Sequence, residues 1–185
     1  ECTQPWVACD MDVESEEGAK AVEVRKAMNI AIDRQTLVDE LLSGFGRVQS
    51  VRDWMGHDHR QNPDWNYDYD PELAKQMLED AGYGDGFEIT LTPAIRGAPA
   101  EVESCHAVAN YWENIGISVK IQNLPYATIR PELISRQYNG ITCLTVSSRL
   151  SPIIGASNYT TDSTYSYGTH HPKLCLLYTS PSPRD

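Results

Sequence analysis

Apolar side chains recur every three or four positions along the first part of the chain, and this spacing predicts helices. The first predicted helix starts near Glu16, and its apolar stripe consists of Val24, Ala27, Met28 and Ala31. Because only one side of the helix is apolar, we expect that side to face a protein core.

Two further helices carry recognisable start and stop signals. Asp33 stands where the N-cap of the second predicted helix is expected, and Gly44 follows the last apolar position of this helix. Asp70 and Pro71 open the third helix, and Gly82 ends it. The apolar stripe of the second helix consists of Leu37, Val38, Leu41 and Leu42. The apolar stripe of the third helix consists of Leu73, Ala74, Met77 and Leu78.

Beyond Gly86 the apolar period shortens to two, which predicts a strand in "FEITLT", residues 87–92. Four more elements are predicted in chain order: a helix from about Ala100 to Asn114, a strand over Ile117–Ile121, a helix from about Ile129 to Gln137 with Pro131 in its first turn, and a strand over Ile141–Val146. Alternating strands and helices predict an α/β fold in which parallel strands are joined by right-handed crossovers.

In open parallel sheets, ligands bind beyond the carboxyl ends of the strands. Three segments are predicted to reach that edge: "PAIRGAP", "QNLPY" and "SSRLSP". We therefore expect the functional residues there.

Two long segments show little periodicity. Residues 45–69 form a connection rich in Gly, Asp, His, Trp and Tyr, and such long connections usually have a function or wrap another part of the structure. Trp54 and Trp65 within it either pack the domain or stack on a ligand, and packing is favoured. The segment after Leu150 is interpreted as loops that cover the sheet edge, with a low-complexity linker as the alternative.

The net charge of the chain argues against two classes of binding partner. The formal net charge of the 185 residues is -11, which disfavours nucleic acid and anionic membrane surfaces because both require a basic footprint. No apolar run approaches the ~18–20 residues that cross a bilayer. The chain starts at Glu1 without a recognisable signal peptide, so we expect it to be a fragment of a longer protein.

The five cysteines form no zinc-binding pattern. Cys2 and Cys9 either form a disulfide or remain unpaired. Cys105 lies on the apolar stripe of its helix and is expected to be a buried thiol. The histidine pairs of "HDH" (residues 57–59) and "HH" (residues 170–171) are interpreted as surface residues, since no further metal ligand accompanies them. No cofactor is expected, and no catalytic motif is present, so the sequence predicts that the protein is not an enzyme.

The last eleven residues, "CLLYTSPSPRD" (Cys175–Asp185), lack a cap, a period and any link to the sheet. They resemble the translation of a transposase mosaic end joined to a sequencing adapter. We therefore expect residues 175–185 to be an artefact and residues 1–174 to be the native part. A short disordered tail is the alternative.

Three blocks of sequence resemble a known family. "VRKAMNIAIDRQTLVDELLSGFG" (residues 24–46), "YDYDPELAKQMLEDAGYGDGFEITLT" (residues 67–92) and "YWENIGISVKIQNLPYATI" (residues 111–129) follow one another in its order and spacing. The family is that of the extracellular solute-binding proteins, family 5, the dipeptide, oligopeptide and nickel receptors of ABC importers.

The resemblance implies a type II periplasmic-binding-protein-like fold with two lobes that close on a ligand by a hinge. Residues 1–174 would be most of the C-terminal lobe. The protein would be periplasmic or lipid-anchored on the outer face of the cytoplasmic membrane, and would deliver a small-molecule or peptide ligand to ABC permease subunits. The alternative is a ligand-sensing domain of a transcription regulator built on the same lobes.

The resemblance also suggests ligand contacts. Arg96 aligns with an arginine that pairs with the ligand carboxylate in dipeptide-binding relatives, and a solvated loop arginine is the alternative. Near Pro152 the sequence departs from the family: Thr145 replaces a tryptophan, and Ser148 replaces the aspartate that holds the peptide amine. Arg149 adds positive charge beside it.

These departures predict a ligand without a free α-amine, anionic or polyhydroxylated. Alternatively, the missing lobe or another residue holds the amine. Ser147 and Asn123 are further candidates at the strand ends.

Overall fold

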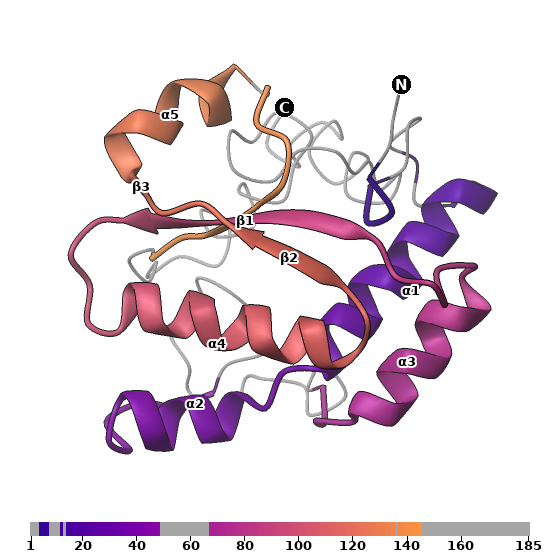
Figure 1. The fold of residues 1–185 in the computed structure, drawn as a ribbon, viewed down its shortest axis with the longest axis horizontal. Coiled ribbons are helices and arrows are strands. Elements are labelled where there is room, and N and C mark those ends of the chain that lie inside the picture. The colour runs from indigo at the N-terminus through magenta and orange to yellow at the C-terminus, as the bar shows by residue number, and fades with distance from the viewer. Residues whose placement is uncertain (1–3, 8–11, 13, 49–66, 136, 146–185) are drawn as a thin grey trace, which may run out of the picture.

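A computed structural model describes residues 4–7, 12, 14–48, 67–135 and 137–145 (Figure 1). The predicted α/β fold is confirmed, and within these ranges there are five helices and four strands. They are α1 (Glu16–Ile30), α2 (Arg34–Leu41), α3 (Pro71–Asp80), β1 (Glu88–Ile95), α4 (Glu101–Asn114), β2 (Ser118–Ile121), β3 (Leu124–Pro125), α5 (Tyr126–Ile134) and β4 (Ile141–Cys143).

The longest strand, β1, is the centre of the sheet, and all of its pairings are parallel. Residues 88–91 pair with β2, residues 94–95 with β3 and residues 91–93 with β4. The predicted parallel arrangement is thus confirmed. Pro93 has no N–H to donate, and it lies opposite the gap between β2 and β3, where the ladder is interrupted.

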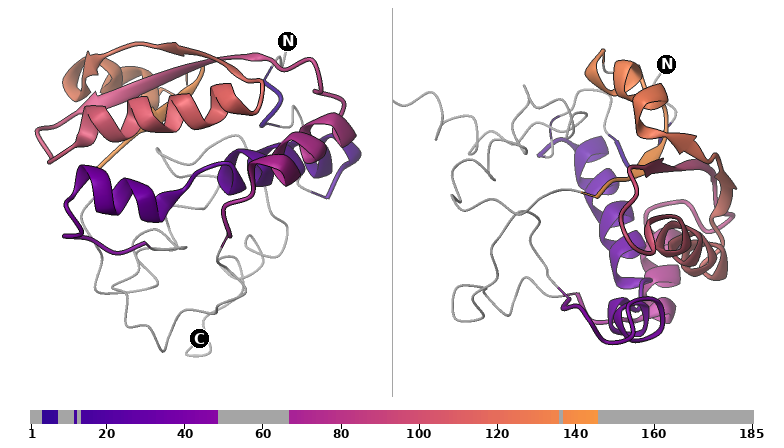
Figure 2. Two further views of the ribbon diagram at one scale, coloured as in Figure 1. Left: turned by 60° about the horizontal axis from the view of Figure 1, so that its bottom comes forward. Right: turned by 90° about the vertical axis from the view of Figure 1, so that its left-hand side faces the viewer.

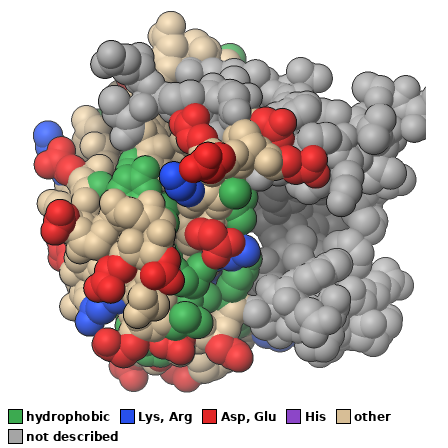
Figure 3. Space-filling model, turned by 90° about the vertical axis from the view of Figure 1, so that its right-hand side faces the viewer, with side chains coloured by type: hydrophobic (Ala, Val, Ile, Leu, Met, Phe, Trp, Pro, Cys, Tyr) green, Lys and Arg blue, Asp and Glu red, His purple; other side chains and the backbone are tan. Residues whose placement is uncertain are grey.

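Helix α4 packs against β1 and β2, and α2 packs against α4 on the side away from the sheet (Figure 2). Helices α1 and α3 lie side by side at one end of the sheet (Figure 1). Their outer face carries many acidic side chains with hydrophobic ones between them (Figure 3). That face is therefore unlike the basic surface needed for binding nucleic acid, in agreement with the net charge.

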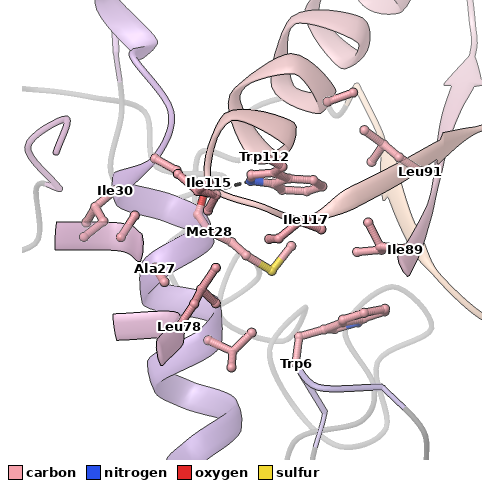
Figure 4. Close-up of a cluster of buried hydrophobic side chains, with 14 of the residues drawn as sticks. Trp6, Ala27, Met28, Ile30, Leu78, Ile89, Leu91, Trp112, Ile115 and Ile117 are labelled. Carbon is pink, nitrogen blue, oxygen red and sulfur yellow. Dashed lines mark hydrogen bonds between the residues drawn. The ribbon is translucent and has the colours of Figure 1, made fainter. Parts of the chain in front are cut away.

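The main core lies where α1, α3 and α4 meet the amino-terminal half of β1 (Figure 4). Its largest fully buried side chains include Leu78, Ile89, Leu91 and Ile117, each of which stabilises the fold by about 1.5–3 kcal/mol through burial. The indole Nε1–H of Trp112 donates to the carbonyl oxygen of Met28 at 2.9 Å, so the buried polar group of the tryptophan has a partner.

The turn between α1 and α2 shows what part of the family motif does. The Asp33 carboxylate accepts from the backbone N–H of Thr36 at 3.0 Å, which makes it the predicted N-cap. The Arg34 guanidinium donates to the backbone oxygen and the side-chain oxygen of Asn29, both at 2.8 Å. These two adjacent residues fix the angle at which α2 leaves α1.

Four expectations from the sequence are corrected. Strand β1 extends to Ile95 and includes Pro93, and a short strand β3 forms within the expected loop "QNLPY". Helix α5 begins at Tyr126 rather than near Ile129, which places Pro131 in its interior. Strand β4 ends at Cys143 instead of Val146. Strand β3 is an element that was missed, and the other three errors are at element ends, where tertiary pairing decides the boundary.

The prediction for Cys105 is half correct. Its side chain is fully buried, but it is not a thiol: it forms a disulfide with Cys143, with the two Cα atoms 5.9 Å apart. Helix α4 packs on β1, and β4 pairs with β1, so the fold brings the two sulfur atoms together in a way that sequence spacing does not reveal. Cys2, Cys9, Trp54, Trp65, residues 57–59 and residues 170–185 lie outside the described residues.

None of the helices in the described ranges has the length and apolar character needed to cross a bilayer.

Candidate ligand-binding site at the carboxyl ends of the strands

The carboxyl ends of parallel strands meet at one edge of a sheet, and here they bring together Arg96, Glu101 and Thr145. Arg96 directly follows β1, Thr145 follows β4 by two residues, and Glu101 is the first residue of α4. Figure 1 shows the short loop that leads from the end of β1 to the start of α4. Polar groups from three segments thus converge at the edge where ligands of such sheets bind.

Arg96 is exposed, yet its guanidinium is held from two sides. Nη1 donates to the carbonyl oxygen of Thr145 at 3.0 Å, and the guanidinium carbon lies 4.7 Å from the centroid of the Tyr126 ring. An exposed cation–π contact of this kind contributes roughly 0.5–1 kcal/mol. In the described part of the chain, this is the one hydrogen bond that the guanidinium donates. Its remaining N–H groups are therefore not used there.

Glu101 is the one buried acidic side chain of the described ranges, with a relative exposure of 8%. One carboxylate oxygen, Oε2, accepts from the backbone N–H groups of Arg96, Gly97 and Ala98 at 2.7, 3.0 and 3.3 Å. The other, Oε1, accepts from the Thr145 hydroxyl at 2.9 Å. Four hydrogen bonds offset the cost of removing this charge from water.

The conformation of the loop makes this arrangement possible. Gly97 adopts φ +90° and Ala100 adopts φ +52°, so the chain bends back and turns three successive N–H groups toward a single point. Successive N–H groups in such a bend form a site for an anion. The Glu101 carboxylate fills that site from within the chain.

The surroundings of Glu101 also determine its ionisation. Burial alone raises the pKa of this carboxyl group, but the hydrogen bonds from Arg96, Thr145, Ala98 and Gly97 stabilise the charged form. Their combined effect lowers the pKa below the ordinary value of 4.5. The carboxylate is thus ionised throughout the neutral range.

The structure places only some of the predicted site residues. Arg96 lies at the predicted edge, and Asn123 is exposed in the gap between β2 and β3, where it makes no hydrogen bond to a described residue. Ser147, Ser148 and Arg149 lie outside the described residues.

Sequence reasoning missed Glu101. An acidic residue in the first turn of a helix usually reflects the helix dipole, and two such residues occur in α4. The hydrogen bonds from the N–H groups of residues 96–98 show that the side chain turns back to the preceding loop instead, and the positive φ values of Gly97 and Ala100 allow the loop to bend in this way.

Two grooves between helices lie away from this edge. One, of about 460 Å³, is lined by α1 and α3, and the other, of about 230 Å³, by α2 and α4. Neither includes Arg96 or Asn123 among its lining residues. In the ranges described, no three His, Cys, Asp or Glu side chains gather in a group that could hold a metal ion.

Comparison with known proteins agrees with this architecture. The family described as "Bacterial extracellular solute-binding proteins, family 5 Middle" matches residues 11–167. Heme-binding protein A of Haemophilus influenzae is 30% identical over 152 residues, which are 74% of this chain and 27% of that protein. Di/tripeptide-binding protein 1 of Pseudomonas aeruginosa is 30% identical over 110 residues, which are 54% of this chain and 19% of that protein.

Solved structures show the same fold. HbpA2 from Haemophilus parasuis superposes with a TM-score of 0.71 at 22% identity, over 95% of this chain and 36% of that chain. NikZ from Campylobacter jejuni, in complex with Ni(L-His), superposes with a TM-score of 0.66 at 18% identity, over 93% of this chain and 38% of that chain. The chain thus spans about a fifth to two fifths of the length of these relatives.

The resemblance that the three sequence blocks indicated is confirmed. The fold is that of one lobe of a type II periplasmic binding protein. The chain belongs to the bacterial extracellular solute-binding proteins of family 5.

Proposed function

We propose that this chain is part of the substrate-binding component of an ABC importer, and that Arg96 holds a carboxylate of the captured solute. The observation that carries the proposal is the position of Arg96: it is exposed at the carboxyl end of the central strand, with its guanidinium held by Thr145 and Tyr126. A planar guanidinium suits a carboxylate because it can donate two parallel hydrogen bonds.

The names of the relatives support a receptor of solutes. They include a heme-binding protein, di/tripeptide-binding proteins and a glutathione-binding protein. By the same relationship, the protein would act outside the cytoplasmic membrane, either periplasmic or lipid-anchored, and would pass its ligand to ABC permease subunits. It would work by binding and release, without catalysis.

The differences between this sequence and its family after β4 restrict the chemical class of the proposed ligand. Ser148 occupies the place of the aspartate that holds the peptide amine in relatives, and a serine hydroxyl cannot neutralise an ammonium group. Arg149, the next residue, is positively charged and would repel that ammonium. The ligand would thus be a small carboxylate, peptide-like or otherwise, that lacks a free α-amine.

Three related probes test this proposal by NMR titration of the 185-residue chain. N-acetyl-alanyl-alanine carries the carboxylate alone, alanyl-alanine amide carries the amine alone, and alanyl-alanine carries both. We expect the acetylated acid to bind best and the amide not to bind. A single lobe supplies contacts from one side only, so we expect weak, millimolar affinity.

Arg96→Ala should abolish binding of the acetylated acid, whereas Arg130→Ala should not. Arg130 is an exposed arginine of α5, so it serves as a charge-matched control. Equal binding of the amide and the acid would refute the carboxylate contact. Tighter binding of alanyl-alanine than of its acetylated form would refute the absence of an amine contact.

A further inference from the structure

We infer that Glu101 is a positioning residue, which holds Arg96 in the orientation that receives the ligand carboxylate. This inference rests on the proposed function and deepens it, because it assigns a role to the buried charge of Glu101 beside Arg96. The structure offers three observations: a closed ring of hydrogen bonds, the cost of burying this carboxylate, and the lack of an ion pair between Arg96 and any described residue.

The ring of hydrogen bonds holds Arg96 at both ends. Its backbone N–H donates to Glu101 Oε2, and its guanidinium donates to the carbonyl oxygen of Thr145. The Thr145 hydroxyl in turn donates to Glu101 Oε1. The Glu101 carboxylate therefore fixes the backbone from which the Arg96 side chain extends. It also fixes the position of Thr145, whose carbonyl group orients the Arg96 guanidinium.

Burying the Glu101 carboxylate at the end of the loop is unfavourable in itself, because a charge removed from water costs free energy unless it is fully hydrogen-bonded. Ordinary helix starts use a Ser, Thr, Asp or Asn side chain as the N-cap. Here the N-cap position is Ala100, whose side chain makes no capping hydrogen bond. The carboxylate instead serves the N–H groups of residues 96–98, which belong to the loop that carries Arg96.

Among the described residues, no acidic side chain forms an ion pair with Arg96. The ion pairs found among the described residues join Lys20 to Glu16, Lys26 to Glu23 and Lys75 to Glu72, and none of them involves Arg96 or Glu101. Glu101 thus organises Arg96 through its backbone while the guanidinium keeps its positive charge for an anion. Such preorganisation raises affinity because less side-chain freedom is lost on binding.

The test measures the order of the Arg96 side chain without any ligand. We compare the heteronuclear NOE of the Arg96 Nε–H group by NMR in the wild type, Glu101→Ala, Glu101→Gln and Glu103→Ala. Exposed Arg130 is the internal reference for a mobile side chain. Glu103, an exposed residue in the same turn of α4, is the matched control because its removal deletes the same charge.

In Glu101→Ala we expect the NOE of Arg96 to fall to that of Arg130, and in Glu103→Ala to stay at the wild-type value. Glu101→Gln should preserve most of the order, because the amide oxygen can accept from the loop and the amide N–H can donate to the Thr145 hydroxyl. An unchanged NOE in Glu101→Ala, or an equal fall in Glu103→Ala, would overturn the inference.

Thr145→Val provides a second variant in case Glu101→Ala does not fold. It removes the hydroxyl that links Thr145 to Glu101, and we expect a smaller fall in the NOE of Arg96. An unchanged NOE here would contradict the closed ring.

Affinity for N-acetyl-alanyl-alanine is measured on the same samples, and we expect a loss of about three- to tenfold in Glu101→Ala. If the wild type binds none of the probes, the proposed function fails, while the ligand-free NOE still decides the role of Glu101.

Discussion

The Cys105–Cys143 disulfide joins α4 to β4 one helical turn beyond Glu101. Glu101 and Cys105 are four residues apart, so they lie on the same face of α4. Cys143 and Thr145 are two residues apart along the segment that begins as β4. Helix α4 is therefore joined twice to residues 143–145, by a covalent bond in the core and by the Glu101–Thr145 hydrogen bond at the candidate ligand-binding edge.

The first prediction concerns this disulfide. The sequence separation of its cysteines is 38, and for a closed loop of that size the chain-entropy model gives a stabilisation of about 3–4 kcal/mol. We expect Cys105→Ser with Cys143→Ser to lower the free energy of unfolding by roughly that amount in urea titrations. A reductant should destabilise the wild type more than the double variant, because only the wild type contains the Cys105–Cys143 disulfide. Equal stability of the oxidised wild type and the double variant would contradict the prediction.

The second prediction concerns acid. The pKa of Glu101 is lower in the folded protein than its ordinary value. At pH values between the folded-state pKa and the ordinary pKa, the unfolded chain therefore binds more protons than the folded protein, and the free energy of unfolding rises with pH. The contribution of the carboxylate is present in full above about pH 5 and is lost as pH falls through the folded-state pKa. The stability advantage of the wild type over Glu101→Gln should therefore shrink below the ordinary value of 4.5.

Urea unfolding at pH 7 and at successively lower pH measures that difference. Asp33 also has a lowered pKa, caused first by the hydrogen bond from the Thr36 backbone, but it is present in both proteins and cancels. Glu103→Gln is the charge-matched reference from the same turn. A stability difference that stays constant from pH 7 down to about pH 3 would show that Glu101 has no special stabilisation of its charged form.

The five helices and three of the four strands were predictable because their signals are local. Asp70 caps α3 through the Leu73 N–H, and Pro71 stands at its first position, as the sequence indicated. The partner of Cys105 was not predictable, since 38 residues separate it from Cys143 and packing alone brings them together. Pro131 illustrates a third case: sequence rules put proline in a first turn, but α5 begins early enough to enclose it.

The candidate site was predictable to a similar degree. Arg96 was identified because a topological rule places strand ends at the binding edge, and a family resemblance indicated an arginine there. Glu101 was not identified, because its role depends on the backbone angles of Gly97 and Ala100, which sequence does not specify. A residue at a strand end is therefore easier to predict than a residue whose contacts depend on the conformation of a loop.

The third prediction concerns the turn between α1 and α2. Asp33→Ala removes the hydrogen bonds from the Thr36 backbone N–H and hydroxyl, at 3.0 and 2.7 Å. Loss of an N-cap usually costs about 1 kcal/mol. We expect this decrease in the free energy of unfolding by urea, against less than about 0.5 kcal/mol for the exposed control Glu40→Ala in the same helix. Equal effects of the two substitutions would show that Asp33 does not act as a cap.

The fourth prediction concerns the close approach of two glycines where β1 and β2 begin to pair. Gly86 adopts φ +75°, and a Cβ atom on it would collide with the backbone oxygen of Gly116. Gly82 adopts φ +87°, but a Cβ atom there meets nothing within 4 Å. Both positions are strained for alanine, and only Gly86 is also blocked by rigid backbone.

Gly82→Ala should therefore lower the free energy of unfolding by about 1 kcal/mol, from the backbone conformation alone. Gly86→Ala should cost a further 1–3 kcal/mol or so, because the strands must separate to admit the methyl group. Urea titrations of the two variants give the comparison directly, and the difference between them isolates the contact with Gly116 from the strain that both share. If the two variants lost the same stability, the tight approach of residues 86 and 116 would not be a feature of the folded chain, and the register of β1 against β2 would have to be revised.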